Sequence, residues 1–345
     1  MSTVGLDSTC KQREAVMSET ATPTQPKPAF SDPLDVHALL TTPPAPLDHV
    51  LPGLLAGTVG MLAGPGGAGK TMLELQLAIA MATGTPACAG LFAGLLPTSK
   101  PARVVLVAAE ESKAVLAHRL HAIAHTLFER REQFCIKLAF EDFLARLQNN
   151  LRLFAGTTQS YALLDADQQR TRVLKDLAKA CEGARLVLID PLRQFHDCDE
   201  NDSAAMNKLV QALRSLAEHV GAAVLFAHHA SKAATFSGQG DAAGAARGSS
   251  ALTDGVRWQL NLSRLSRDQA QHAGVSEVAR GLVLLLDVAK ANYLPPQPTI
   301  RLQRLAGGVL AVTESVAGQV TQTRAKVPST AAPRARQLKL AGAHA

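Results

Sequence analysis

The chain has 345 residues, of which 47% are hydrophobic and 19% charged, and its formal net charge is +6. This length can bury the core of one large domain or of two small ones. No apolar run reaches about 18 residues without a charge, and the N-terminus is polar, so we expect no membrane span, no signal peptide and a cytoplasmic protein. The five cysteines are scattered without a C-x-x-C pair, which favours reduced thiols over disulfides or a zinc site.

The first 50 residues form a leader rich in proline, threonine and serine, so we expect most of it to be disordered. Only residues 33–40 (PLDVHALL) carry a short apolar pattern within it. Two interpretations of this segment stay open: an arm that packs on a neighbouring subunit, or a plain flexible leader.

A glycine-rich run between residues 64 and 71 fits the motif G-x-x-x-x-G-K-[ST] at every fixed position. Its members are Gly64, Pro65, Gly66, Gly67, Ala68, Gly69, Lys70 and Thr71. An apolar strand at 59–63 precedes the run and a strong helix former at 72–81 follows it. We predict that backbone N–H groups wrap phosphates here, that Lys70 reaches the β- and γ-phosphates, and that Thr71 holds Mg²⁺.

A second apolar strand is predicted at 103–109 and is followed by Glu110 and Glu111. Ligands bind at the carboxyl edge of parallel sheets, so we expect Glu110 to polarise the attacking water. The alternative is that both glutamates only favour the start of the helix that begins near Ser112.

Two further strands end in polar residues that suit the same site. The strand at 185–190 ends in Asp190, and a terminal aspartate some 120 residues after a phosphate loop is expected to bind the Mg²⁺ shell. The strand at 222–227 is followed by His228 and His229, one of which could contact the γ-phosphate. The alternative for this pair is a buried or solvated position without a role in the site.

The remaining elements are predicted from apolar pattern alone. We expect helices at 114–128 and 129–150, strands at 256–262 and 280–290, a mobile glycine-rich loop at 233–246, and a hairpin of 299–304 with 308–313. The three histidines of the first helix (His118, His121 and His125) lack a nearby carboxylate or cysteine, so a solvated face is preferred over a metal site. Residues 321–345 carry five basic and no acidic residues, so this tail supplies most of the net charge.

These elements predict one α/β domain at 51–316, with a mostly parallel sheet, helices on both faces and a C-terminal antiparallel hairpin. A leader at 1–50 precedes the domain, and a disordered basic tail at 317–345 follows it.

The motifs, taken in order, resemble those of RecA-like P-loop ATPases, and above all the RepA-type hexameric replicative helicases of plasmids. The resemblance spans residues 54–313 and rests on the phosphate loop, Ala-Glu-Glu, Asp-Pro-Leu-Arg-Gln-Phe, His-His-Ala-Ser-Lys, Arg-Gly-Ser-Ser, Val-Arg-Trp and Lys-Ala-Asn-Tyr. It implies a ring of six copies that binds ATP and Mg²⁺ between subunits, moves 5′→3′ on single-stranded DNA and works with other replication initiation proteins.

The resemblance also assigns roles to single residues. It implies that Glu110 is the catalytic carboxylate, that His229 senses the γ-phosphate, and that Arg257 is an arginine finger acting on the neighbouring subunit. Lys290 matches a lysine that reaches a neighbour's nucleotide. Arg247 and Arg264 compete with Arg257 for the role of the finger.

A second function, from another class, stays open: a RecA-like ATPase that regulates or scaffolds replication without unwinding DNA. The two loops expected to face a ring channel, 193–206 and 232–246, hold few cations, namely Arg193 and Lys232, with Arg247 at the edge. These cations are few for contacts with a DNA backbone.

Overall fold

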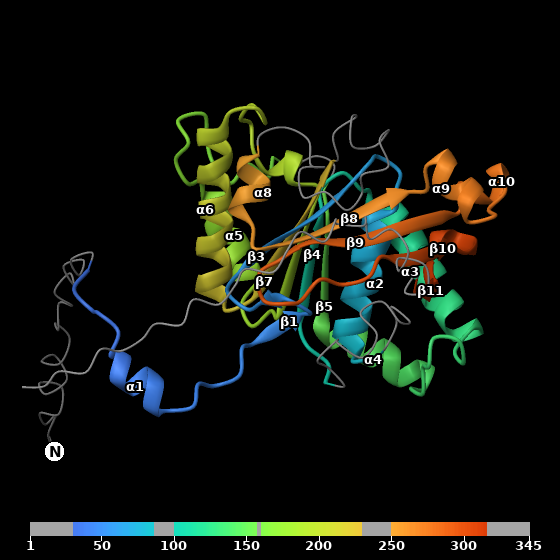
Figure 1. The fold of residues 1–345 in the computed structure, drawn as a ribbon, viewed down its shortest axis with the longest axis horizontal. Coiled ribbons are helices and arrows are strands. Elements are labelled where there is room, and N and C mark those ends of the chain that lie inside the picture. Colours follow the sequence, from blue (N-terminus) through green and yellow to red (C-terminus); the bar gives the residue numbers. More distant parts are fainter. Residues whose placement is uncertain (1–29, 86–99, 157–159, 230–249, 316–345) are drawn as a thin grey trace, which may run out of the picture. The chain divides into compact units, whose positions relative to one another are not determined.

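The computed structural model describes residues 30–85, 100–156, 160–229 and 250–315 (Figure 1). The chain divides into two compact units, residues 1–46 and 47–345. The expected loop at 233–246, the basic tail at 317–345 and the first 29 residues of the leader lie outside the described residues.

The described part of the first unit contains one short helix, α1 (Val36–Thr41). Asp35 caps it, because its side chain accepts a hydrogen bond of 3.1 Å from the N–H of Ala38. None of the residues of α1 is buried, and its apolar side chains, among them Leu39 and Leu40, are exposed.

The second unit is built on a nine-stranded sheet in the order β11-β10-β9-β8-β3-β7-β6-β4-β5. Its strands are β3 (Val59–Gly64), β4 (Val104–Ala108), β5 (Leu151–Ala155), β6 (Leu186–Asp190), β7 (Ala223–His229), β8 (Trp258–Arg264), β9 (Val283–Ala291), β10 (Ile300–Arg304) and β11 (Leu310–Ser315). A separate pair consists of β1 (His49–Leu51) and β2 (Leu54–Leu55).

Helices cover both faces of this sheet (Figure 1). They are α2 (Lys70–Thr83), α3 (Lys113–Glu129), α4 (Phe140–Asn150), α5 (Arg172–Ala180), η1 (Leu192–Phe195), α6 (Ser203–Val220), α8 (Ala251–Gly255), α9 (Arg267–His272), α10 (Glu277–Arg280) and η3 (Ala306–Gly308). Strand residues alternate between two cores: Leu106 packs in the core with α2, α3 and α4, whereas Val105 and Val107 pack with α5, α6 and α8.

The sheet is parallel from β8 through β5 and antiparallel beyond β8. The last two strands, β10 and β11, continue the antiparallel part next to β9. The predicted α/β architecture is therefore confirmed: a mostly parallel sheet with flanking helices and antiparallel strands at its C-terminal side.

Two predicted elements differ from the structure. The helix expected at 129–150 is two elements, because the chain turns between α3 and α4 and inserts Phe134 and Ile136 into the core. The strand expected from residue 280 starts only at Val283, because residues 277–280 form α10. Ser276 caps α10 by accepting from the N–H of Ala279, a start signal that the apolar pattern did not include.

Trp258 joins β8 to the β1–β2 pair. Its side chain is fully buried, its indole N–H donates to the carbonyl oxygen of Pro52 at 2.8 Å, and a Cβ on Gly60 would lie 2.9 Å from its ring. The small residue at position 60 therefore makes room for this ring.

We expect Trp258→Ala to lower the free energy of unfolding by about 3–5 kcal/mol, because it leaves a large cavity and an unpaired carbonyl. Urea unfolding followed by far-UV circular dichroism measures the change. Val278→Ala removes an apolar side chain that is 89% exposed and serves as the control. A loss for Trp258→Ala no larger than that of the control would contradict the packing role.

Candidate functional site

The glycine-rich run forms the connection between the carboxyl end of β3 and the start of α2. Gly67 and Gly69 have positive φ angles of 68° and 103°, which glycine adopts at little cost. The side chain of Lys70 is buried, and its Nζ donates to the carbonyl oxygens of Gly64 at 2.9 Å and Pro65 at 3.2 Å. Burial lowers the pKa of Lys70, while nearby carboxylates, first that of Asp190, raise it.

Thr71 and Asp190 meet beside this loop. The Thr71 hydroxyl donates to Oδ2 of Asp190 at 2.5 Å, although the two residues are 119 positions apart in the sequence. Burial raises the pKa of Asp190, and the bond from Thr71 opposes that shift. A hydroxyl and a carboxylate at the edge of a phosphate loop are oxygen ligands of the kind that Mg²⁺ prefers, so the residues present fit that ion.

Glu74 is a buried carboxyl that the sequence analysis missed. It lies one turn after Lys70 on α2 and is fully enclosed. Burial, and then the charge of Asp190, raises its pKa well above the ordinary value. A single glutamate inside the apolar helix MLELQLAIAM was the signal that could have identified it.

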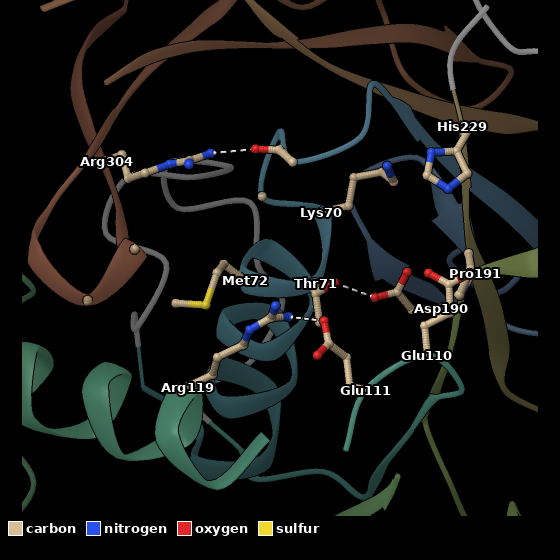
Figure 2. Close-up of a pocket in the computed structure, with 14 residues that line it drawn as sticks. Lys70, Thr71, Met72, Glu110, Glu111, Arg119, Asp190, Pro191, His229 and Arg304 are labelled. Atoms are coloured by element: carbon tan, nitrogen blue, oxygen red, sulfur yellow. Dashed lines mark hydrogen bonds and ion pairs between the residues drawn. The ribbon is translucent and has the colours of Figure 1, made fainter. Parts of the chain in front are cut away.

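The two glutamates after β4 have different partners. Oε1 of Glu110 accepts a hydrogen bond of 3.0 Å from Nε2 of Gln194 in η1. Oε1 of Glu111 forms an ion pair of 2.7 Å with Arg119 on α3. Figure 2 shows Glu111 turned toward Arg119 and Glu110 on the side of Asp190. Neither Gln194 nor Arg119 was predicted, because both lie on segments whose packing the sequence pattern does not give.

His229 ends β7 directly beside the loop, where its backbone pairs with Gly64 of β3. Its ring lies near the side chain of Lys70 (Figure 2). Burial, and then the charge of Lys70, lowers the pKa of His229, which favours the neutral imidazole at neutral pH.

These side chains surround one cavity of about 430 Å³ (Figure 2). It is lined by Gly67, Gly69, Lys70, Thr71, Met72, Glu110, Glu111, Arg119, Asp190, Pro191, His229, Arg304, Gly307 and Gly308. The structure thus brings together the predicted side chains Lys70, Thr71, Glu110, Asp190 and His229, which come from the ends of neighbouring parallel strands and the start of α2.

The structure does not bring Arg257 and Lys290 to this cavity. Arg257 precedes β8, and Lys290 lies near the end of the antiparallel β9, opposite Gln259 of β8. Both residues are therefore at the amino-terminal end of the parallel strands, whereas the phosphate loop lies at the carboxyl end. Nζ of Lys290 donates to the carbonyl oxygen of Thr253 at 2.7 Å. Burial lowers the pKa of Lys290, and the nearby charge of Arg257 lowers it further.

The other two candidate arginines differ from Arg257. Arg264 ends β8 at the loop edge, and its Nη2 donates to the carbonyl oxygen of Gly67 in the same chain at 3.1 Å. Arg247 lies outside the described residues.

Comparisons with known proteins bear on the family and on the fold of the chain. The model of a family described as "AAA domain" matches residues 23–235, more than half of the chain. A solved structure of an ATPase domain superposes with a TM-score of 0.51 at 16% sequence identity, covering 74% of this chain and 85% of that one. The structure of a DnaB-like replicative helicase and its interactions with primase gives a TM-score of 0.50 at 17% identity, covering 75% of this chain and 58% of that one. Among the described helices, none combines the length and the apolar composition needed to cross a lipid bilayer.

The raised pKa of Glu74 has a consequence for stability. Above about pH 4.5 the carboxyl ionises in the unfolded chain while it stays protonated in the folded one, so the unfolding free energy falls as the pH rises through this window. We expect Glu74→Gln, whose amide cannot ionise, to be more stable than the wild type at about pH 7.5, by a margin that shrinks toward about pH 4.5.

Urea unfolding of nucleotide-free protein at several pH values measures that margin. Glu141→Gln on α4 removes an exposed carboxyl from another part of the fold and is the matched control. A margin for Glu74→Gln that does not change with pH would contradict a raised pKa at this position.

Proposed function

Because the chain belongs to the AAA domain family and has a RecA-like P-loop ATPase fold, we propose that it is an ATP-driven DNA helicase motor. One observation carries the proposal. The phosphate loop, the Thr71–Asp190 pair, Glu110 and His229 converge on a single cavity. In the proposed assembly, six copies form a ring that moves 5′→3′ on single-stranded DNA during plasmid-type replication, together with other initiation proteins.

The residues of the cavity divide the work of ATP hydrolysis among them. The loop amides and Lys70 bind the β- and γ-phosphates, and Thr71 and Asp190 would hold Mg²⁺. Bound there, that ion would supply positive charge against the phosphate oxygens. The neutral imidazole of His229 lies beside Lys70, where it donates a hydrogen bond to the γ-phosphate without adding a second cation.

Glu110 is the better candidate for the base that orients the attacking water. Glu111 is held by its ion pair with Arg119, whereas Glu110 is bonded only to the neutral amide of Gln194 among the described residues. The charge of Glu110 is also among those that raise the pKa of the buried Lys70, which supports a position near the lysine of the loop. A carboxylate that is not held in an ion pair can accept a hydrogen bond from the attacking water.

The position of Arg257 and Lys290 supports a shared site between subunits. They lie at the edge opposite the loop of their own chain, so any nucleotide that they contact belongs to a neighbour. An arginine supplied in this way stabilises the charge of the transition state. The exposed apolar residues of α1 suit the arm proposed to pack on an adjacent subunit.

An alternative function is an ATPase that regulates or scaffolds replication without unwinding. The segment 193–206, expected to face the channel, favours it: Asp197, Asp199, Glu200 and Asp202 outnumber its one arginine. That arginine, Arg193, donates to the carbonyl oxygen of His196 at 2.8 Å and lies 4.0 Å from Glu200. An acidic loop repels a DNA backbone.

Two assays separate the two functions. A motor should hydrolyse ATP faster when single-stranded DNA is added and should unwind a forked duplex. A scaffold should hydrolyse ATP at the same rate with and without DNA and should leave the duplex intact. Either result requires ATP hydrolysis by the same cavity.

We expect Glu110→Gln to bind ATP normally but to hydrolyse it about 10²–10⁴-fold more slowly, because an amide cannot accept the proton of the attacking water. Glu111→Gln should have a milder effect and is the matched control, since it breaks an ion pair at the rim of the same cavity. Phosphate release and fluorescent-nucleotide binding measure the two steps. A reversed order of the two effects would assign the base to Glu111.

Mixing two inactive variants tests the shared site. Lys70→Ala should abolish hydrolysis, and Arg257→Ala should lower it by about 10³-fold or more while leaving ATP bound. In mixed rings, roughly a quarter of the interfaces combine an intact Lys70 with an intact Arg257, so part of the activity should return.

Arg264→Ala serves as the control partner in this mixing experiment, because Arg264 contacts the loop of its own chain. Mixing with Lys70→Ala should therefore not restore what Arg264→Ala loses, whereas it should restore part of what Arg257→Ala loses. If mixed oligomers of Lys70→Ala and Arg257→Ala form but recover no activity, Arg257 does not act across the interface.

A further inference from the structure

Two arginines bind the phosphate loop by its carbonyl oxygens, and the phosphate-loop motif requires neither. Nη2 of Arg304, the last residue of β10, donates to the carbonyl oxygens of Gly67 at 3.2 Å and Ala68 at 2.7 Å. Arg264 donates to the same carbonyl of Gly67 at 3.1 Å. Figure 2 shows Arg304 reaching the loop from one side, while the side chain of Lys70 extends on the other side, toward His229.

The loop is shaped to admit these side chains. A Cβ on Gly69 would lie 3.2 Å from Nη2 of Arg304, and a Cβ on Gly67 would lie 3.3 Å from Nη2 of Arg264. Position 67 is one of the variable positions of the motif, so phosphate binding alone does not demand glycine there. The glycine serves both the positive φ angle and the close approach of an arginine.

The peptide geometry connects these bonds to phosphate binding. In a trans peptide the C=O and the N–H point in opposite directions. When Arg304 holds the carbonyl of Ala68, the N–H of Gly69 therefore points away from Arg304. Anion binding by such a loop requires its N–H groups to face the ligand and its carbonyl oxygens to face outward. An outward carbonyl that is already bonded cannot turn toward the phosphates.

Arg304 lies at the end of a strand that is hydrogen-bonded on both sides. Its backbone N–H donates to the carbonyl of Leu282 at 2.7 Å, and β10 is paired on both sides, by β9 and β11. The buried amide of Gln76 on α2 makes two bonds of 2.8 Å with the backbone of Leu310 on β11. The β10–β11 hairpin is therefore attached to the phosphate-loop helix as well as to the loop.

We propose that Arg304, assisted by Arg264, is a positioning residue that holds the phosphate loop by its carbonyl oxygens in the conformation that binds nucleotide. The inference rests on the proposed binding of nucleotide phosphates by this loop, and it does not depend on DNA unwinding. The two guanidinium groups can lie close together because both face the partial negative charges of carbonyl oxygens.

The first test measures the loop without any nucleotide. In full-length protein, Arg304→Ala should accelerate amide hydrogen exchange in residues 64–71 by about tenfold or more, because charge-assisted bonds to the loop are lost. Exchange in β4 and β6 should stay unchanged. Arg267→Ala removes a side chain that is 84% exposed on α9 and is the matched control.

The second test measures binding and turnover separately. Arg304→Ala should weaken the binding of fluorescent ADP by about tenfold, while ATP turnover at saturating ATP stays within about twofold of the wild type. Arg304→Lys should fall between the two, because an ammonium keeps the charge but lacks the planar guanidinium. Arg264→Ala should show a smaller loss of the same kind.

Unchanged loop exchange and unchanged ADP affinity in Arg304→Ala would overturn the proposal. A fall in turnover at saturating ATP with unchanged exchange would also overturn it, since Arg304 would then act on the reacting phosphate. If Arg304→Ala does not fold, Arg304→Lys and Arg264→Ala carry the same comparison. Failure of the proposed nucleotide binding would give a different result, because wild-type protein would then bind no ADP. The exchange experiment contains no nucleotide, so its result would be independent of that failure.

Discussion

The pairing register of the four parallel strands β3, β7, β6 and β4 is the constraint on which the site depends. Gly64 of β3 pairs with His229 of β7, and Asp190 of β6 pairs with Ala108 of β4, two residues before Glu110. Because the side-chain period of a strand is two, a slip of one residue would turn Asp190 or His229 to the other face of the sheet. The apolar residues that alternate along each strand prevent this slip, since they fill two different cores. The packing of the sheet thus fixes where the side chains of the site lie relative to one another.

Buried charge is the second feature that organises the cavity. Lys70, Glu74 and Asp190 lie within one turn of α2 and the end of β6, and all three are largely removed from water. Their pKa shifts share burial as the leading cause, and each is partly offset by a neighbour of opposite charge. Groups of this kind are costly for a core and are typical of functional sites. An ion and a nucleotide would supply the charges that this cluster is built to balance.

The antiparallel pair β8 and β9 connects the two ends of the strands in the sheet. Strand β8 begins next to Arg257 at the edge proposed to face a neighbour, and it ends at Arg264, which bonds the phosphate loop of its own chain. Strand β9 runs back beside it and ends near Lys290. In the proposed ring, this pair of strands would hold Arg264 for the nucleotide site of its own chain, and Arg257 and Lys290 for the site of a neighbour. A shift of the two strands would then move both sets of residues together.

The sequence by itself determined the fold class and the residues of the phosphate loop, because both depend on local patterns: buried strands that end in polar residues, and glycines at fixed spacing before a helix. It named Glu110 as the catalytic candidate, but it could not show the contacts that distinguish this residue from Glu111, since their partners, Gln194 and Arg119, come from other elements. It also missed Glu74 and Arg304, whose importance lies in their contacts with residues far away in the sequence: Asp190 for Glu74 and the phosphate loop for Arg304. Only the tertiary structure decided that Arg264 contacts the loop of its own chain and that Arg257 lies at the opposite edge. The order of strands in the sheet sets these distances, and that order is not written in any local pattern.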